Sequence, residues 1–319
     1  MNHGWMELEV VAREMLATDI VGLVLADPEG EELPPFSAGS HIDVEIAPDL
    51  IRQYSLCNAP LERNRYEIAV LKDPASRGGS VKLHESLREG ARVRVSEPRN
   101  HFSLEHSEAK AILLGGGIGV TPLLCMAERL ATTGAPFEFH YCTRSPDRTA
   151  FRDRIARAPY ADKVHLHFDD GQPDQLLDPA ALFARAEQGA HAYVCGPAGF
   201  IDWVYAAAEK AGFSTQQIHR EYFTAVPQEP AAGDQAVFEV QIASTGAVYA
   251  VPADKSVAQV LEENGIAVPV SCEQGVCGTC ITRVLQGEPD HRDMLALDGN
   301  AEFTPCCSRS FSPRLVLDL

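Results

Sequence analysis

Three cysteines in the C-terminal part of the sequence limit what this chain can fold into more than any other feature. Cys272, Cys277 and Cys280 have the spacing C-x4-C-x2-C, and a further cysteine, Cys306 or Cys307, follows. Thiolates at this spacing are ligands of [2Fe–2S] clusters, which need a short loop curled around two irons. The glycines within the loop suit such a path, because glycine adopts backbone angles closed to other residues. The spacing therefore predicts a carrier of single electrons.

Two other uses of cysteine fit the sequence less well. Structural zinc sites usually have paired C-x2-C motifs, and this sequence has one such pair. A disulfide framework is disfavoured because nine cysteines is an odd number and the N-terminus has no basic and apolar stretch typical of a signal peptide. Cys57, Cys125 and Cys142 lie in apolar runs, so we expect them in the core.

The composition favours a globular protein of the cytoplasm. A chain of 319 residues is long enough for two or three domains. No apolar run approaches the about 18 residues of a transmembrane helix. The net charge of −18 would repel the phosphates of a nucleic acid. We therefore expect neither a membrane nor a nucleic acid as partner.

The order of predicted elements divides the chain into three blocks and a linker. Residues 1–105 contain six short β-type runs and one helical stretch, which predicts a small antiparallel β-barrel. Residues 106–225 alternate strands and helices, which is typical of a parallel sheet covered on both faces. Residues 226–236, rich in Pro, Gly and Ala, predict a linker. Residues 237–319 contain a hairpin, a helix and the cysteine loop. The helices expected in the second block are Thr121–Ala131, Thr149–Ala158, Pro179–Glu187 and Gly199–Ala211.

Two short motifs in the first block have the chemistry to bind a phosphate and an aromatic ring. Arg52 and Tyr54 are two residues apart on a predicted strand, so their side chains point to the same face. Arginine binds phosphate through two parallel hydrogen bonds, and tyrosine can lie against a ring. The sequence Arg77-Gly-Gly-Ser80 opens a helix, whose free N–H groups can bind an anion. Each motif alone also fits an ordinary strand or turn.

Two motifs of the second block follow predicted strands. Residues 115–119 form a glycine-rich turn, and Thr121-Pro122 replaces the last glycine that a G-x-G-x-x-G motif would have. A Rossmann dehydrogenase is therefore disfavoured, although glycines after a strand still let a nucleotide approach the backbone. The sequence Cys195-Gly-Pro197 follows another strand. Alone, Cys195 would also fit a buried thiol at a strand end.

In this order, the motifs resemble those of the ferredoxin–NADP reductase superfamily. The C-terminal cysteine loop, which has the plant-type ferredoxin spacing, narrows the resemblance to the phthalate dioxygenase reductase family. Three stretches are similar to reductases of vanillate-type O-demethylases: residues 51–58, 70–80 and 290–293. The resemblance covers essentially the whole chain.

The resemblance implies FMN in the barrel, NADH in the second block and a [2Fe–2S] cluster in a C-terminal ferredoxin domain of the β-grasp fold. The residues that match the flavin motifs are Arg52, Tyr54, Ser55, Arg77, Gly79 and Ser80. The residues expected near NADH are Gly117, Thr121, Asp169, Cys195, Gly196, Pro197 and Phe223, of which Cys195 and Phe223, with Ser55, would position the nicotinamide and flavin. The family pattern favours Cys272, Cys277, Cys280 and Cys306 as cluster ligands, with Cys307 as a buried neighbour. Tyr222 competes with Phe223 for the position against the flavin.

Acidic residues favour NADH over NADPH. Asp169 and Asp170 follow the predicted strand Val164–Phe168. A carboxylate there accepts a hydrogen bond from the ribose 2′-hydroxyl and repels a 2′-phosphate. Arg144, after another strand, could bind that phosphate instead, so the alternative stays open.

Together these implications predict an oxidoreductase that serves a Rieske-type aromatic oxygenase or O-demethylase. Electrons would pass from NADH through FMN and the cluster to the oxygenase, and the cofactors would carry the chemistry, so we expect no catalytic acid, base or nucleophile. One alternative is a reductase of the same architecture for another acceptor, such as a cytochrome or a non-aromatic oxygenase. The other is a non-catalytic redox sensor, although the sequence has no visible output module.

Overall fold

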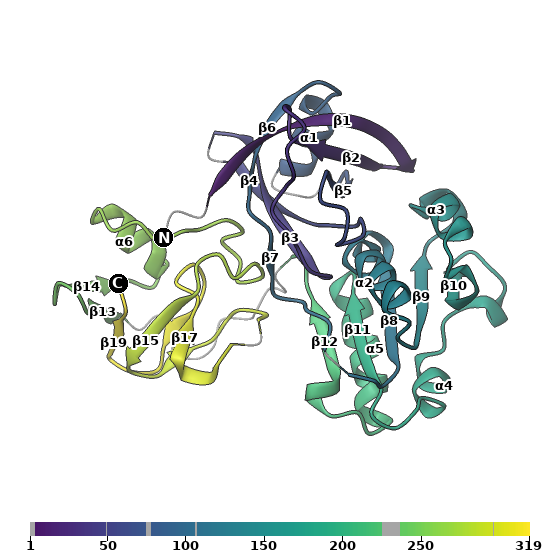
Figure 1. The fold of residues 1–319 in the computed structure, drawn as a ribbon. Coiled ribbons are helices and arrows are strands. Elements are labelled where there is room, and N and C mark those ends of the chain that lie inside the picture. The colour runs from purple at the N-terminus through teal and green to yellow at the C-terminus, as the bar shows by residue number, and fades with distance from the viewer. Residues whose placement is uncertain (1–3, 49, 75–77, 106, 225–236, 296) are drawn as a thin grey trace. The chain divides into compact units, whose positions relative to one another are not determined.

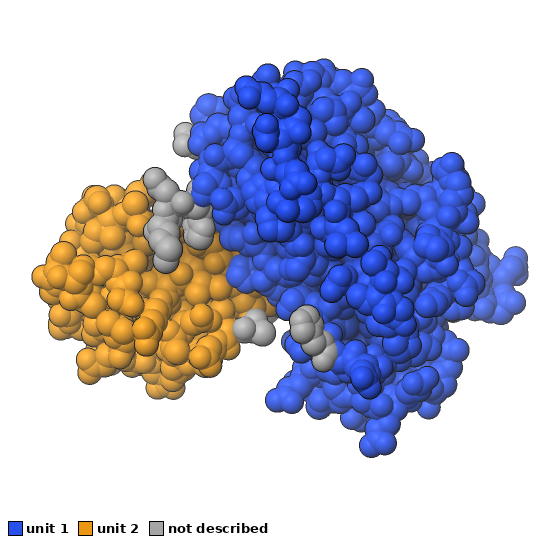
Figure 2. All heavy atoms as spheres, viewed as in Figure 1, with its two compact units in different colours: residues 1–223 blue, residues 224–319 orange. Residues whose placement is uncertain are grey.

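The computed structural model describes residues 4–48, 50–74, 78–105, 107–224, 237–295 and 297–319 (Figure 1). Arg77 and the expected linker, residues 226–236, lie outside these described residues. The chain forms two compact units, residues 1–223 and residues 224–319 (Figure 2). No helix in the described ranges is both long enough and apolar enough to cross a membrane.

The first part of the larger unit is an antiparallel β-barrel. Its strands follow the order β4-β3-β6-β1-β2-β5, and β7 pairs with β3. A bridge between Leu56, just after β4, and Ile68 on β5 joins the two ends of this sheet and closes it. The elements are β1 (Trp5–Ala17), β2 (Ile20–Ala26), β3 (Ser40–Ala47), β4 (Leu50–Ser55), β5 (Tyr66–Leu71), α1 (Gly79–Ser86), β6 (Arg92–Ser96) and β7 (Arg99–Asn100).

Alternation along the strands fills the barrel interior. Val21 and Leu23 on β2 are fully buried, and across the strand pair they meet Val70 and Ile68 on β5. Each such side chain contributes about 1.5–3 kcal/mol when it leaves water. Because every second side chain points inward, apolar residues alternate along the sequence, and this alternation is what predicts the strands.

The second part of the larger unit is a parallel sheet with strand order β10-β9-β8-β11-β12. The chain runs outward from β8 to β9 and β10, and then crosses to β11 and β12 on the other side of β8. The order therefore reverses between β8 and β11, and ligands of open parallel sheets bind beyond the carboxyl ends of strands at such a point. The elements are β8 (Ala111–Gly116), α2 (Val120–Thr133), β9 (Phe137–Thr143), α3 (Arg152–Arg157), β10 (Val164–Phe168), α4 (Pro179–Ala184), β11 (His191–Cys195), α5 (Ala198–Lys210) and β12 (Ile218–Glu221). Single 3₁₀ turns are η1 (Gly117–Gly119), η2 (Pro146–Arg148), η3 (Ala161–Lys163), η4 (Pro173–Gln175) and η5 (Thr215–Gln217).

The barrel and the parallel sheet share a hydrophobic core. Cys57 and Phe102 from the barrel side are buried in the same cluster as Leu113 on β8 and Val120 on α2. At the edge of this contact, Arg154 on α3 pairs with Glu67 on β5 at 3.0 Å and with Glu128 on α2 at 3.3 Å. Residues 1–223 therefore pack as one body, although two sheets build it.

The smaller unit is a mixed sheet of order β14-β13-β19-β15-β17 with one helix. Its first and last strands, β13 and β19, are parallel neighbours, and α6 packs on the sheet through Val257 and Leu261. Ser256 and Gln259 cap the N-terminus of α6 reciprocally, which satisfies two N–H groups. The elements are β13 (Phe238–Ile242), β14 (Val248–Val251), α6 (Val257–Glu263), β15 (Thr282–Gln286), β16 (Pro289–Asp290), η6 (Gly299–Ala301), β17 (Glu302–Phe303), β18 (Arg309–Ser310) and β19 (Arg314–Leu317), and β16 pairs with β18.

Candidate functional site

The start of α1 and the neighbouring strand β4 form a site for an anion. A Cβ atom on Gly79, the first residue of α1, would lie 2.7 Å from Cγ of Arg52, so glycine lets the arginine lie against the helix start. Gly78, at φ 83°, is the N-cap of the helix and has no side chain to cap the first turn. The N–H groups of the helix start and a guanidinium therefore lie together, which fits the phosphate of a flavin nucleotide. Ser80 accepts a hydrogen bond from the Asp73 backbone N–H at 3.1 Å.

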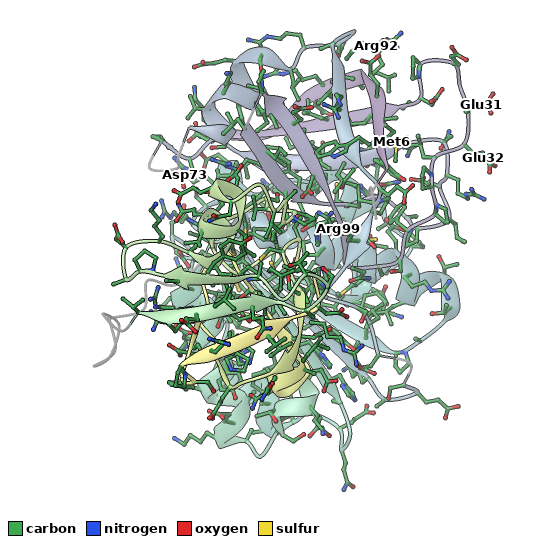
Figure 3. All side chains as sticks on the ribbon, turned by 90° about the vertical axis from the view of Figure 1, so that its left-hand side faces the viewer. Met6, Glu31, Glu32, Asp73, Arg92 and Arg99 are labelled. Carbon is green, nitrogen blue, oxygen red and sulfur yellow. The ribbon has the colours of Figure 1, made fainter. Side chains whose placement is uncertain are left out.

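An ion pair between β7 and β3 supports the strand that carries this site. Arg99 on β7, labelled in Figure 3, donates to the Asp43 carboxylate on β3. Both side chains are largely buried. Asp43 also accepts from the Gln53 side chain on β4 at 2.9 Å. Gln53 points to the opposite face from Arg52 and Tyr54, as strand alternation predicts. By contrast, Arg92, labelled in Figure 3, forms an exposed pair with Glu7 at 3.2 Å. Such a pair contributes little to stability.

Tyr54 supplies a neutral aromatic face beside Arg52. Burial raises the pKa of its phenol well above the usual range, although the Arg52 charge lowers it. The hydroxyl therefore stays protonated at any physiological pH. An uncharged phenol on this half-buried strand fits the aromatic ring system of a flavin.

Three polar groups meet where the barrel touches the parallel sheet. The Ser55 hydroxyl, at the end of β4, donates to the Glu221 carboxyl at 3.5 Å. The Cys195 thiol, at the end of β11, lies 4.0 Å from the same oxygen, because Cys195 and Glu221 are register partners on β11 and β12. Burial raises the pKa of Glu221 to about 8 and the pKa of Cys195 well above its usual range. All three groups are therefore neutral near pH 7, and they lie at the carboxyl edge of the sheet beside its switch point.

The glycine-rich turn after β8 has two different functions along its length. A Cβ atom on Gly119 would lie 2.3 Å from the Cys195 carbonyl oxygen, so the turn can pack against β11 only with glycine there. Gly117 has φ 56°, and its Cβ position meets no described atom within 4 Å. The Thr121 hydroxyl donates to the Ile118 carbonyl at 3.1 Å and is buried in the turn. Gly117 is thus open to a ligand, whereas Thr121 stabilises the turn.

The remaining nucleotide candidates lie along the same carboxyl edge. Asp169 and Asp170 are exposed after β10, and their N–H groups bond to the carbonyls of Thr143 and Arg144 after β9. At the other end, Phe223 is 39% exposed after β12, whereas Tyr222 is 5% exposed and donates to Asp202 at 3.3 Å. Exposure leaves Phe223 free to lie against a ring, and Tyr222 belongs to the packing of the sheet.

The cysteine loop of the smaller unit brings four thiols together. Cys272, Cys277, Cys280 and Cys306 are each less than 10% exposed. The N–H groups of Gln274 and Thr279 point at Cys272 and Cys277 sulfur at 3.3 and 3.5 Å. Hydrogen bonds of this kind stabilise the charge of an iron–sulfur cluster. Four sulfurs with such donors fit a [2Fe–2S] group.

The structure distinguishes the two adjacent cysteines near the C-terminus. The Cys306 thiol contacts those of Cys272, Cys280 and the adjacent Cys307, and Cys272 in turn contacts Cys277. Besides Cys306, the Cys307 sulfur has the Thr304 hydroxyl as a neighbour at 3.3 Å, and a Cβ on Gly275 would lie 2.5 Å from it. This geometry favours Cys306 as the fourth ligand and gives Cys307 a packing position behind the loop.

Comparison with known proteins agrees with this geometry. Residues 240–310 match the model of the 2Fe-2S iron-sulfur cluster binding domain. The vanillate O-demethylase oxidoreductase of Pseudomonas sp. (strain HR199 / DSM 7063) is 52% identical over 98% of this chain and 99% of its own length. The phthalate dioxygenase reductase of Burkholderia cepacia is 38% identical over 100% of this chain and 98% of its own. The chain belongs to the phthalate dioxygenase reductase family.

Solved structures extend this family assignment to the fold. A phthalate dioxygenase reductase, described as a modular structure for electron transfer from pyridine nucleotides to [2Fe-2S], superposes with a TM-score of 0.73, covering 99% of this chain and 98% of that one at 38% identity. An intact type IV self-sufficient cytochrome P450 monooxygenase superposes with a TM-score of 0.90 at 36% identity. The superposition covers 99% of this chain and 41% of the P450 chain. The predicted barrel, parallel-sheet and ferredoxin folds of this reductase are therefore confirmed.

Sequence reasoning missed one residue of the site. Glu221 ends a four-residue strand with a single apolar position, and no glycine or cysteine motif marks it. Its neighbours Ser55 and Cys195 are 166 and 26 residues away in sequence, so only the folded chain brings the three groups together. The one available signal was that an acidic residue stands immediately before the Tyr222-Phe223 pair.

Proposed function

We propose that this chain is the reductase component of an oxygenase system, which takes electrons from NADH and delivers them to the oxygenase. The observation that carries the proposal is that one chain combines the Arg52–Gly79 anion site, the Ser55–Cys195–Glu221 group and the four-thiol loop. Full-length relatives support it: a vanillate O-demethylase oxidoreductase, a phthalate dioxygenase reductase and a phenoxybenzoate dioxygenase subunit beta. The cofactors are FMN, NADH and a [2Fe–2S] cluster.

When bound, FMN supplies the conversion between the two-electron chemistry of NADH and the one-electron chemistry of the cluster. Arg52 and the N–H groups at the start of α1 would hold its phosphate, and Tyr54 would lie against its ring. Gly117 would leave room for the nucleotide, and the exposed ring of Phe223 would lie against the flavin. The neutral groups of Ser55, Cys195 and Glu221 would orient the nicotinamide without placing a full charge beside it.

For the acceptor, we propose a Rieske-type oxygenase that acts on an aromatic acid. The relatives of vanillate and phthalate systems favour this class.

A second class of acceptor has specific support of its own. The reductase subunit of a tert-butanol monooxygenase from Aquincola tertiaricarbonis is 44% identical over 91% of this chain. The P450 similarity also favours a haem acceptor for this architecture.

Reconstitution tests the proposal. The purified reductase is mixed with NADH and, in separate reactions, a vanillate-type oxygenase with a Rieske centre, a non-aromatic oxygenase and a cytochrome P450. We expect reduction of the Rieske centre, followed by visible spectroscopy, to be at least about tenfold faster than reduction of the other two. Faster reduction of either alternative acceptor would contradict the Rieske assignment. Slow NADH oxidation with every acceptor, ferricyanide included, would identify a redox sensor instead.

A further inference from the structure

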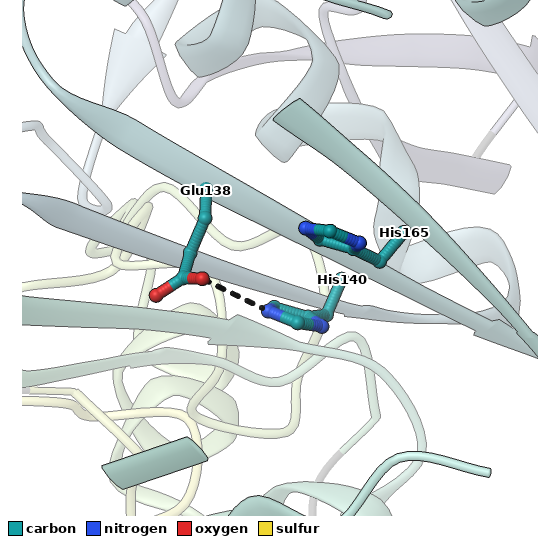
Figure 4. A group of neighbouring side chains, drawn as sticks. All are labelled: Glu138, His140 and His165. Atoms are coloured by element: carbon teal, nitrogen blue, oxygen red, sulfur yellow. Dashed lines mark ion pairs between the residues drawn. The ribbon is translucent and has the colours of Figure 1, made fainter. Parts of the chain in front are cut away.

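A group of ligand-type side chains lies on the outer strands of the parallel sheet, apart from the flavin and cluster sites. Alternate residues of β9, Phe139 among them, pack against the α2 core, so Glu138 and His140 face the opposite side. His165 on β10 is the register partner of His140, and the two rings stack at 4.9 Å (Figure 4). One ligand atom from each of Glu138, His140 and His165 lies within 4.8 Å of the others.

A chain of hydrogen bonds fixes which nitrogen of His140 carries a proton. Nδ1 of His167 lies 2.6 Å from the Gln175 carbonyl, so this nitrogen donates. In the neutral tautomer that carries its proton on Nδ1, the Nε2 of His167 is an acceptor. His140 Nδ1, at 3.0 Å from that Nε2, must therefore be the donor. In neutral His140 the lone pair is then on Nε2.

This lone pair points at a carboxylate. His140 Nε2 lies 3.6 Å from Glu138 Oε2, and among the described residues it has no hydrogen-bond partner (Figure 4). The His140 side chain is 5% exposed, so water does not compensate a lone pair that faces a negative oxygen. A cation between the two atoms would satisfy both.

The distances suit a small metal ion. Two ligands of a tetrahedral zinc ion, with bonds of about 2.1 Å, lie about 3.4 Å apart. This is close to the 3.6 Å between His140 and Glu138. The second nitrogen of His140 bonds to His167, and such a partner orients a metal-binding histidine. His165 is exposed, which leaves room for its ring to turn inward and for water to complete the coordination.

We propose that Glu138, His140 and His165 bind a divalent transition-metal ion, with Zn²⁺ as the preferred ion and water as the fourth ligand. Two imidazoles and one carboxylate suit zinc, whereas Mg²⁺ and Ca²⁺ favour oxygen ligands. Lys110 holds the other oxygen of Glu138 at 3.2 Å and orients the carboxylate. Arg185, whose side chain is 61% exposed, lies 3.4 Å from Oε2 and competes with the metal for that atom.

The test is equilibrium dialysis of the holoprotein, with its flavin and cluster in place, against buffered Zn²⁺, followed by metal analysis. The wild type should bind one zinc ion per chain. The variant His165→Ala should bind this ion at least about tenfold more weakly, because losing a metal ligand lowers the affinity at least as much as losing a hydrogen bond that supports a ligand. His165 is exposed, so this variant should fold. Arg185→Ala should bind zinc severalfold more tightly, because a competing cation is removed.

A matched control removes a histidine from the other edge of the same sheet. His191 and His219 form a similar pair at 3.0 Å on β11 and β12, so His219→Ala should bind zinc as the wild type does. The visible absorption of the cluster, unchanged throughout, would show that zinc has not replaced iron. Equal zinc affinity of the wild type and His165→Ala would overturn the proposal and leave a proton as the cation between His140 and Glu138.

Discussion

The carboxyl group of Glu221 couples the stability of this reductase to pH. Burial raises its pKa from 4.5 to about 8, although the hydrogen bond from Ser55 acts in the opposite direction. Between these two values the folded chain keeps a proton that the unfolded chain has lost. The stabilisation linked to this proton is therefore complete below about pH 4.5 and is lost as the pH rises through about 8.

Glu221→Gln should remove this dependence. Between about pH 5 and 8, the wild type should lose about 1.4 kcal/mol of unfolding free energy per pH unit relative to the variant. The wild type is therefore the one that becomes less stable as the pH rises. Urea unfolding, followed by flavin release at several pH values, measures this difference. Parallel pH curves for the two proteins would show that Glu221 is already ionised in the folded chain.

The two adjacent cysteines at the end of the cluster loop should respond differently to substitution. Cys306→Ser should abolish the cluster absorption, because its thiol contacts Cys272 and Cys280. Cys307→Ser should keep the absorption, because that sulfur lies against the Thr304 hydroxyl instead. Both variants should still oxidise NADH with ferricyanide, since the flavin and nucleotide residues lie in the other unit. Loss of the cluster in Cys307→Ser alone would reverse the assignment.

At the scale of elements, the sequence predicts those strands and helices whose own periodicity is strong. The predicted Val164–Phe168 strand agrees with β10 in both bounds, because it is a compact β-type run between turns. The expected helix Thr149–Ala158 is shorter in the structure, since Phe151 adopts a left-handed conformation at φ 64° and α3 begins after it. β16, β17 and β18 have two residues each and exist through pairing with distant partners, which no local pattern encodes.

The same distinction applies to the candidate site. Glycine turns and cysteine spacings are local, so the sequence indicates Gly117, Gly79 and the thiols of Cys272, Cys277 and Cys280 directly. The choice of Cys306 over Cys307 comes from the family pattern. Thr121 was expected near NADH, and its hydroxyl is engaged inside the turn. The meeting of Ser55, Cys195 and Glu221 depends on docking of the barrel against the parallel sheet, which the sequence does not reveal.

The loop after β10 should determine the choice between NADH and NADPH. Asp169 is exposed at the carboxyl edge of the sheet, where a carboxylate would accept the ribose 2′-hydroxyl and repel a 2′-phosphate. Asp169→Asn should narrow the preference for NADH by about 1–2 kcal/mol, or roughly 5- to 30-fold. The measurement is kcat/KM for both nucleotides in wild type and variant. An unchanged ratio would move the ribose site toward Asp170 or Arg144.

At the scale of the whole molecule, charge should control how the reductase meets its oxygenase. Residues 237–319 contain 11 Asp and Glu against 5 Lys and Arg, a net charge of −6 before any cluster is bound. A basic surface on the oxygenase would speed encounter with this unit, and salt would screen the attraction. Electron transfer to the oxygenase should therefore slow severalfold from about 50 to about 500 mM salt. NADH oxidation with a small neutral acceptor should slow less, and equal slowing of both would contradict electrostatic docking.

The distribution of hydrophobic cores bears on how such a chain could have been assembled in evolution. The core that holds Cys57 and Phe102 together with Leu113 crosses from the barrel to the parallel sheet, whereas the core around Val240 and Leu315 belongs to the last unit alone. A genetic crossover near residue 105 would divide a shared interior and expose both halves. A crossover near residue 224 falls between the two compact units and would leave both of these cores whole. Gene fusion and domain exchange should therefore succeed at the second junction and fail at the first.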